Sequence, residues 1–311
     1  MTRVAIIGAG ISGLACARQL AKAGVSVVVF DKGRGIGGRV ATRRAGDLQF
    51  DHGAPFVRAQ RDDFSALLAS LTVDGSAVPW TDDKGVTWTV GSPGMSAIPK
   101  AMGVGLDVRL GTQILKVNAN QSGWHLHYDE TEYVATHIVM TVPKPQIAGL
   151  LGYTHPLIPQ IADVKMEPGL TLMATVSGST PSITPFLPDD PLALITCDNS
   201  KPNRPLNEST AWVAQAGTEF SVTHLEKNLP DIAALMLPLL CERLDVTLSC
   251  ITHAVAHRWR YSRVSKALGQ PFVSTPDRTL YLGGDWCVGP DIEDAWTSGM
   301  AIAQDLLERE L

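Results

Sequence analysis

The feature that most constrains the fold lies at the start of the chain, where an apolar run is followed by a glycine-rich turn. Residues 4–7 read Val-Ala-Ile-Ile, the pattern of a strand buried on both faces. Residues 8–13 read Gly-Ala-Gly-Ile-Ser-Gly. We predict a helix over about residues 11–23 and a second strand over residues 25–30. This order predicts the first βαβ unit of a doubly wound, Rossmann-type α/β domain.

The glycines and their neighbours suit a dinucleotide. Gly8 permits the tight turn, Gly10 lets the backbone approach a phosphate, and Gly13 lets the helix pack closely on the strand. The helix N-terminus and the Ser12 hydroxyl can donate to a pyrophosphate. Asp31, at the end of the second strand, can accept both ribose hydroxyls. A lone glycine motif is weak evidence, but here strand, helix and acid stand where a dinucleotide site needs them.

The segment after Asp31 favours FAD over NAD. Residues 32–39 read Lys-Gly-Arg-Gly-Ile-Gly-Gly-Arg, a glycine-rich basic loop. Such a loop can wrap a pyrophosphate from the side opposite the helix, with Arg39 as its fork-shaped partner. The alternative interpretation is a solvated, flexible loop.

Composition limits the classes of protein. The 311 residues, 45% of them hydrophobic, suffice for a large core and suggest two domains. The net charge of −5 argues against nucleic acid as the main partner. No apolar run reaches the ~18 residues of a membrane span, and a core strand that begins by Val4 leaves no room for a signal peptide. The five cysteines form no C-x-x-C pair, so we expect reduced thiols in a cytoplasmic protein.

The order of predicted elements indicates a discontinuous first domain. We expect an FAD-binding domain over residues 1–56, 91–148 and 270–311. A mainly antiparallel substrate domain, over residues 57–90 and 149–269, would be inserted into it. We expect the substrate pocket between the two domains, and its predicted lining residues are Val57, Arg58, Arg61, Ser96, Trp259 and Asp291.

The alternation of residues 251–261 predicts a strand. On a strand His253 and His257 lie ~13 Å apart, too far to share one metal ion, so we expect no metal site. Trp259 and Tyr261 share one strand face, and Arg258 lies on the other. The aromatic pair either sandwiches a planar pyridine ring or packs in the core.

Several of these segments resemble a known family. The chain resembles the flavin amine oxidase superfamily in residues 8–13, Asp31, residues 37–39 and the pair Gly284-Asp285. Within it, the chain looks like the bacterial renalases. The segments that carry this likeness are residues 41–44, 51–54, 141–146, 257–262 and 283–285.

The resemblance implies a p-hydroxybenzoate-hydroxylase-like fold that holds FAD without a covalent bond. It also implies oxidation of the 2- and 6-dihydro isomers of NAD(P)H to NAD(P)+, with hydride passing to the flavin and dioxygen becoming hydrogen peroxide. The partners would be a dinucleotide substrate and dioxygen. The alternatives are a flavin amine oxidase and a flavin-binding redox sensor without enzymatic activity. Lys266 is the only lysine after Arg243, and Trp286 and Trp296 replace paired tyrosines, which weakens the amine oxidase alternative.

The resemblance also implies individual roles. Asp31 and Lys32 would meet the adenosine ribose, and Asp285 the ribityl chain. No catalytic side chain is expected, because hydride transfer from a dihydropyridine requires placement of the rings rather than a base. The implied FAD contacts are Gly8, Gly10, Ser12, Gly13, Asp31, Lys32, Arg39, Pro55, Phe56, Val117 (through its backbone), Asp285 and Ile292.

Overall fold

The computed structural model describes residues 2–178, 180, 187, 190–205 and 208–310. The chain forms two compact units, and each is built from separate chain segments. The first unit consists of Met1–Gly38, Pro99–Met166 and Val264–Leu311. The second unit consists of Arg39–Ile98 and Glu167–Arg263. No helix in the described part of the chain is both long and apolar enough to cross a membrane.

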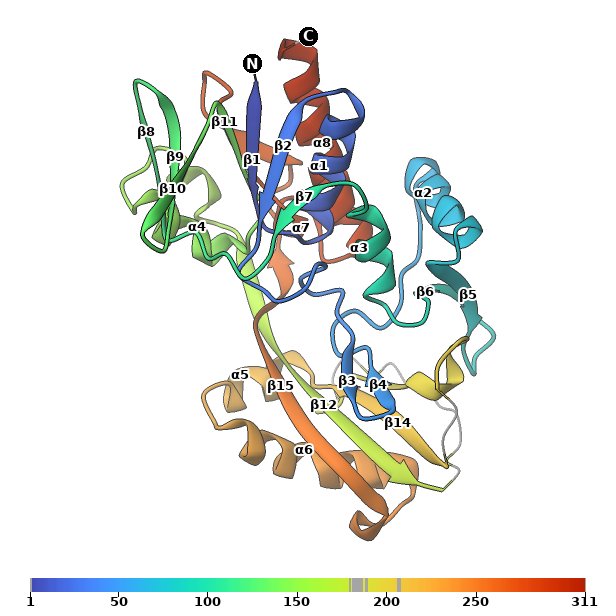
Figure 1. The fold of residues 1–311 in the computed structure, drawn as a ribbon. Coiled ribbons are helices and arrows are strands. Elements are labelled where there is room, and N and C mark those ends of the chain that lie inside the picture. Colours follow the sequence, from blue (N-terminus) through green and yellow to red (C-terminus); the bar gives the residue numbers. More distant parts are fainter. Residues whose placement is uncertain (1, 179, 181–186, 188–189, 206–207, 311) are drawn as a thin grey trace. The chain divides into compact units, whose positions relative to one another are not determined.

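The first unit is organised around a six-stranded sheet (Figure 1). Five of its strands are parallel, and only the edge strand β16 runs antiparallel to its neighbour β17. In spatial order the strands are β16 (Phe272–Ser274), β17 (Leu280–Gly283), β11 (His137–Met140), β1 (Arg3–Ile7), β2 (Ser26–Phe30) and β7 (Asp107–Arg109).

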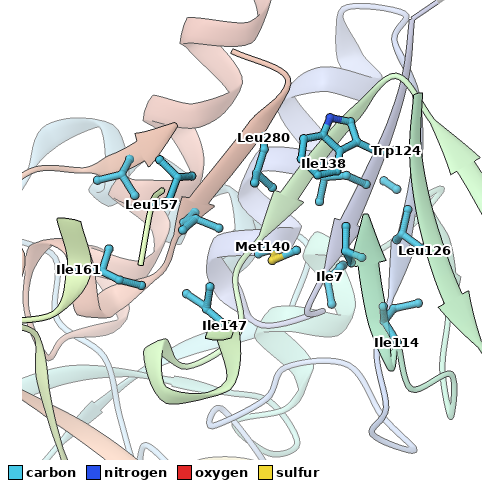
Figure 2. Packing of buried hydrophobic residues seen from close by; sticks show 14 of the residues in the cluster. Ile7, Ile114, Trp124, Leu126, Ile138, Met140, Ile147, Leu157, Ile161 and Leu280 are labelled. Atoms are coloured by element: carbon cyan, nitrogen blue, oxygen red, sulfur yellow. The ribbon is translucent and has the colours of Figure 1, made fainter. Parts of the chain in front are cut away.

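Both faces of this parallel sheet are covered, as its continuous apolar strands require. One face packs against α1 (Ile11–Lys22) and α8 (Ile292–Glu310) through residues such as Ile6, Leu20 and Ile302. The other face packs against a three-stranded antiparallel sheet, where Ile7, Met140 and Leu280 lie close to Trp124 and Leu126 (Figure 2). That sheet consists of β8 (Lys116–Asn120), β9 (Gly123–Tyr128) and β10 (Thr131–Ala135).

Short helices complete the first unit. Ile147 on α4, together with Leu157 and Ile161, adds to the core shown in Figure 2. The helices are α3 (Ala97–Met102), whose first two residues belong to the second unit, α4 (Lys144–Leu151), the 3-10 turn η1 (Pro159–Ile161) and α7 (Asp285–Val288).

The second unit is organised around a four-stranded sheet in the order β13-β14-β12-β15. Strand β14 pairs antiparallel with both β12 and β13. One face packs on α6 through Trp212, Met236 and Leu240. The other face packs on Phe50. The strands are β12 (Lys165–Ser177), β13 (Leu194–Cys197), β14 (Ser209–Gln215) and β15 (Ile251–Lys266); the first two residues of β12 and the last three of β15 belong to the first unit. The helices are α5 (Thr218–His224) and α6 (Leu229–Leu244). The short 3-10 turns are η2 (Asp198–Ser200) and η3 (Leu248–Cys250).

The earlier segment of the second unit adds two hairpins and a helix. Phe50, at the end of the first hairpin, is fully buried against Met173 and Val213 of the main sheet. The elements are β3 (Arg43–Ala45), β4 (Leu48–Phe50), α2 (Asp62–Val73), β5 (Ala77–Thr81) and β6 (Thr87–Gly91).

The mixed α/β fold predicted from the sequence is confirmed, with a parallel Rossmann-like sheet and a separate antiparallel sheet. The compact units differ from the predicted domain bounds in four segments. Residues 39–56 and 91–98 lie in the second unit, partly because Phe50 packs on its sheet. Residues 149–166 and 264–269 lie in the first unit, because Leu157 and Ile161 belong to its core.

Candidate functional site

The turn between β1 and α1 has no room for side chains at two of its glycines. Gly8 has a φ of +114°, and a Cβ there would lie 2.7 Å from Thr141 Oγ1. A Cβ on Gly13 would lie 2.0 Å from the Gly8 carbonyl oxygen. At Gly10, by contrast, a Cβ would meet no described atom within 4 Å. The open approach to Gly10 is what a phosphate needs to reach the backbone.

Ser12 provides an independent sign of a ligand at this turn. The residue is only 4% exposed, and its hydroxyl oxygen has no hydrogen-bond partner among the described residues. Buried hydroxyls are almost always hydrogen-bonded. A pyrophosphate at the N-terminus of α1 would supply the missing acceptor, so the residues at this turn fit the group that the sequence predicts.

Asp31 is held rigidly at the carboxyl end of β2. Its Oδ2 accepts the Ala9 N–H at 2.7 Å, and its Oδ1 accepts the Gly33 N–H at 2.6 Å. Each carboxylate oxygen has a second lone pair, so both can still accept ribose hydroxyls. The neighbouring Lys32 is exposed and donates to Gln146 Oε1 at 3.3 Å. The contact of Lys32 with a ribose stays a prediction.

The glycine-rich loop after Asp31 lies directly against the first turn. The Gly37 N–H donates to the Ala9 carbonyl at 2.9 Å, and Gly10 and Gly37 form a parallel β-bridge. A Cβ on Gly38, whose φ is +56°, would lie 3.6 Å from the Gly10 Cα. The structure therefore brings the two glycine motifs together. This arrangement does not support the alternative of a detached, solvated loop.

Three other predicted FAD contacts also lie in the first unit. Val117 is buried on β8 with its side chain in the core, which leaves its backbone for a ligand. Asp285 is buried at the first position of α7, and Ile292 is the first residue of α8. A Cβ on Gly299 of α8 would lie 2.0 Å from the Ser12 carbonyl, so α8 packs tightly on α1.

Arg39 belongs to the second unit, where its guanidinium Nη1 donates to the Ser262 carbonyl at 2.9 Å. Its own carbonyl accepts the Ala54 N–H at 2.9 Å. A Cβ at position 53 would overlap that carbonyl, so only glycine fits there. The contact between Arg39 and a phosphate stays a prediction.

Pro55 and Phe56, two further implied FAD contacts, lie in the second unit beside an aromatic cluster. Pro55 is buried, and the ring of Phe56 lies 4.1 Å from that of Trp88 and 6.1 Å from that of Trp80. Val57 is buried and pairs with Thr89 through backbone hydrogen bonds of 2.8 and 2.9 Å.

Two of the predicted substrate residues line one hollow. Val57 and Arg58 border a surface hollow of about 380 Å³ between α2 and β6. Arg61 caps the N-terminus of α2 and forms a 3.0 Å ion pair with Asp63. Asp291 lies in the first unit, where it is exposed and its N–H donates to Asp294 Oδ2 at 2.9 Å. Within the second unit, the hollow therefore gathers Val57 and Arg58 only.

Trp259 lies in a different group of rings. It stacks on His52 with a centroid distance of 5.2 Å and meets the edge of His257 at 4.3 Å. Its indole N–H donates to the His52 carbonyl at 3.0 Å. Ser96, the remaining predicted residue, donates its N–H to Thr42 Oγ1 at 3.1 Å.

The two histidines beside Trp259 are held neutral. Burial, with smaller contributions from His257 and Arg43, lowers the pKa of His52 to about 4. Burial also lowers the pKa of His257. His52 is 8% exposed, and its Nδ1 has no hydrogen-bond partner among the described residues. At neutral pH this group therefore offers uncharged rings rather than a proton donor of ordinary strength.

Sequence reasoning missed a buried ion cluster around Asp51. Asp51 Oδ2 accepts from Lys201 Nζ at 3.0 Å and from Arg204 Nη2 at 2.7 Å. Lys201 also pairs with Asp198, whose carboxylate accepts the Asp51 N–H. All four side chains are at most 1% exposed.

The pKa directions in this cluster differ between its two acids. Burial tends to raise the pKa of Asp51, but Lys201 and Arg204 outweigh it, and the net pKa is lowered. Burial raises the pKa of Asp198, which Lys201 offsets only in part. Asp51 Oδ1 also accepts the Met95 N–H at 2.9 Å, so the cluster links the segments around Asp51, Met95 and Asp198.

No group of three or more His, Cys, Asp or Glu side chains suited to a metal ion occurs among the described residues. His253 and His257 do lie on a strand, β15, as predicted.

Comparison with known proteins identifies the family. A model of an NAD(P)-binding Rossmann-like domain matches residues 6–71. A model of the flavin-containing amine oxidoreductases matches residues 80–307, which is more than half of the chain. The chain belongs to the flavin-containing amine oxidoreductase family. Its predicted membership of the wider superfamily is thereby confirmed.

Individual relatives within and around this family are distant. AofH of Mycobacterium tuberculosis, a candidate flavin-containing monoamine oxidase, is 37% identical over 70 residues, which cover 22% of this chain and 15% of AofH. A crystal structure of a candidate protoporphyrinogen oxidase from Exiguobacterium is similar with a TM-score of 0.79 at 14% identity, over 99% of both chains. Cyclohexylamine oxidase from Brevibacterium oxydans gives a TM-score of 0.75 at 14% identity, over 99% of this chain and all of that one. These two structures support the fold alone.

The cofactor of this family member is FAD, as predicted, bound without a covalent link. The chain is consistent with that mode of binding. Cys287, the one thiol close to the C-terminal glycine motif, is fully buried, and burial raises its pKa, so it remains a protonated and unreactive thiol.

Proposed function

We propose that this protein is an FAD-dependent oxidase of the renalase type, which converts the 2- and 6-dihydro isomers of NAD(P)H to NAD(P)+. The observation that carries the proposal is a contact between two of the segments that resemble the renalases. Trp259, from residues 257–262, stacks on His52, from residues 51–54, and donates to its carbonyl. Arg39 binds the Ser262 carbonyl from the adjacent glycine motif. Two of the segments that carry the renalase likeness therefore pack against each other.

FAD, when bound, would supply a two-electron acceptor for the hydride, and with one proton from solvent those two electrons would reduce dioxygen to hydrogen peroxide. The chain then has to bind and orient the dinucleotides and exclude water. Gly10, Ser12 and Asp31 provide the open turn, the unpaired hydroxyl and the locked carboxylate for this task. No proton has to leave the donor carbon, which agrees with the neutral state of His52 and His257.

A flavin amine oxidase is the second candidate, and the family match favours it. The lysine and the two tryptophans that bear on amine oxidation are not arranged as an amine oxidase would need them. Lys266 lies in the first unit, is half exposed and pairs with Asp163 at 3.0 Å. Trp286 and Trp296, which replace paired tyrosines, are buried, and the Trp286 indole donates to the Val142 carbonyl at 3.1 Å.

The deciding experiment is anaerobic mixing of the yellow protein with 2-dihydro-NAD, 6-dihydro-NAD, NADH and a panel of amines, followed at the flavin absorbance band. We expect rapid bleaching by the two isomers, slow bleaching by NADH, and peroxide formation once air is admitted. Faster bleaching by an amine would favour the amine oxidase. Bleaching by none of them would favour a redox sensor.

A variant of the packed group tests the same proposal. Trp259→Ala should slow flavin reduction by both isomers while the flavin stays bound, with Trp259→Phe closer to the wild type because a ring remains over His52. Unchanged reduction in Trp259→Ala would remove this residue from the substrate site.

A further inference from the structure

The hollow between α2 and β6 is a defined site within the second unit. Val57 and Thr89, whose backbones are hydrogen-bonded to each other, are among its lining residues. Its volume of about 380 Å³ is at the low end of the range for small-molecule sites, roughly 300–1,000 Å³. A space of this size suits one half of a dinucleotide better than the whole.

One wall of the hollow is an oriented aromatic ring. Trp88 is half-buried, with its indole N–H fixed on Asp82 Oδ2 at 2.9 Å. Phe56 supports it from within the unit at a centroid distance of 4.1 Å. Because both contacts restrict the indole before any ligand arrives, it is prepared to pack against a planar ring such as a nucleobase.

The rest of the lining combines apolar side chains, Ala59, Leu68 and Ala69, with polar ones that include a cation. Arg58 is exposed at the rim, and its guanidinium can bind two oxygens of a phosphate at once. Ser65, Thr72 and Thr87 also line the hollow. The Thr72 hydroxyl donates to the Leu68 carbonyl at 2.9 Å, and the Thr87 hydroxyl bonds to that of Thr81 at 3.1 Å, but each oxygen can still accept from a sugar hydroxyl. Arg61, close in sequence, is already engaged with Asp63.

We propose that this hollow binds the adenosine-phosphate half of the dinucleotide substrate, with Trp88 against the base and Arg58 on the phosphate. This inference rests on the proposed function, because it assigns a subsite to that substrate. The sequence predicts Val57, Arg58 and Trp259 as lining residues of one pocket, whereas this subsite includes Val57 and Arg58 but not Trp259.

AMP, titrated into the FAD-saturated protein by calorimetry, tests the subsite directly. Saturation with FAD keeps AMP out of the cofactor's own adenosine site. We expect AMP to bind the wild type, and Arg58→Ala to weaken it about tenfold or more through loss of a charged hydrogen bond. Trp88→Leu should weaken AMP a few-fold. Arg44→Ala, at an exposed arginine on β3, is the matched control and should bind AMP as the wild type does.

A second titration uses adenosine in place of AMP. Adenosine lacks the phosphate, so Arg58→Ala should leave its affinity unchanged while Trp88→Leu lowers it. Arg58→Ala should also raise the KM for the dihydro dinucleotides. Failure of AMP to bind the wild type, or equal binding in all variants, would overturn the subsite. AMP binding that follows this pattern in a protein whose flavin no dihydro isomer reduces would leave the subsite standing and remove the proposed function.

Discussion

The neutral state of His52 makes a quantitative prediction about stability and pH. In the folded protein its pKa is about 4, whereas an unfolded histidine titrates near 6.5. Between these values the unfolded chain binds more protons, so the free energy of unfolding rises with pH across this window. The stability is complete above about pH 6.5 and is lost as the pH falls toward 4. The difference of about 2.5 pKa units corresponds to about 3 kcal/mol.

Urea unfolding at a series of pH values between 4 and 8 measures this effect. Other acids and histidines also contribute to the wild-type curve, so the informative quantity is the difference between wild type and His52→Phe. Phe keeps a ring over Trp259 but cannot bind a proton. We expect the wild type to lose about 3 kcal/mol more than the variant between pH 6.5 and 4. Parallel curves for the two proteins would refute the assignment of a buried, neutral His52.

Three further changes test the cofactor turn and the ion cluster. Gly13→Ala should lower the flavin-to-protein ratio of the purified protein sharply, because its Cβ would overlap the Gly8 carbonyl; full flavin content would contradict this. Asp51→Asn should lower the free energy of unfolding, measured with urea, by about 3–5 kcal/mol, because it leaves two buried cations undercompensated; an unchanged free energy of unfolding would contradict this. Arg39→Ala should weaken FAD binding far more than Arg258→Ala, by ~1.5–3 kcal/mol per charged hydrogen bond, and equal flavin retention would count against it.

The cofactor turn could be predicted from sequence because its determinants are local. The strand, the glycines and the helix start lie within one short segment, and each glycine has a steric reason that the structure shows directly at Gly8 and Gly13. Asp31 was predictable for the same reason, since it ends the next strand. The sequence also showed the second glycine motif, whereas its β-bridge to Gly10 became visible only in the structure.

The Asp51 cluster was not predictable, because its members are far apart in the chain. Lys201 and Arg204 lie 150 and 153 residues from Asp51, and no spacing rule connects them. The bounds of the compact units differ from the predicted domain bounds for a related reason. Whether the hairpin that ends at Phe50 belongs to one unit or the other depends on which sheet it packs against, and that sheet is formed by later residues.

The division of each unit into separate chain segments has a consequence for synthesis. In the first unit, β1 forms early, but its sheet needs β11 and β17, and α1 needs α8 from the end of the chain. In the second unit, Asp51 emerges long before Lys201 and Arg204 can neutralise it. The second unit can complete its core only after Arg263 has been made, and the first unit only after α8 has been made. Until then the early apolar strands lack the partners that bury them, and exposed apolar strands of this kind are prone to aggregate.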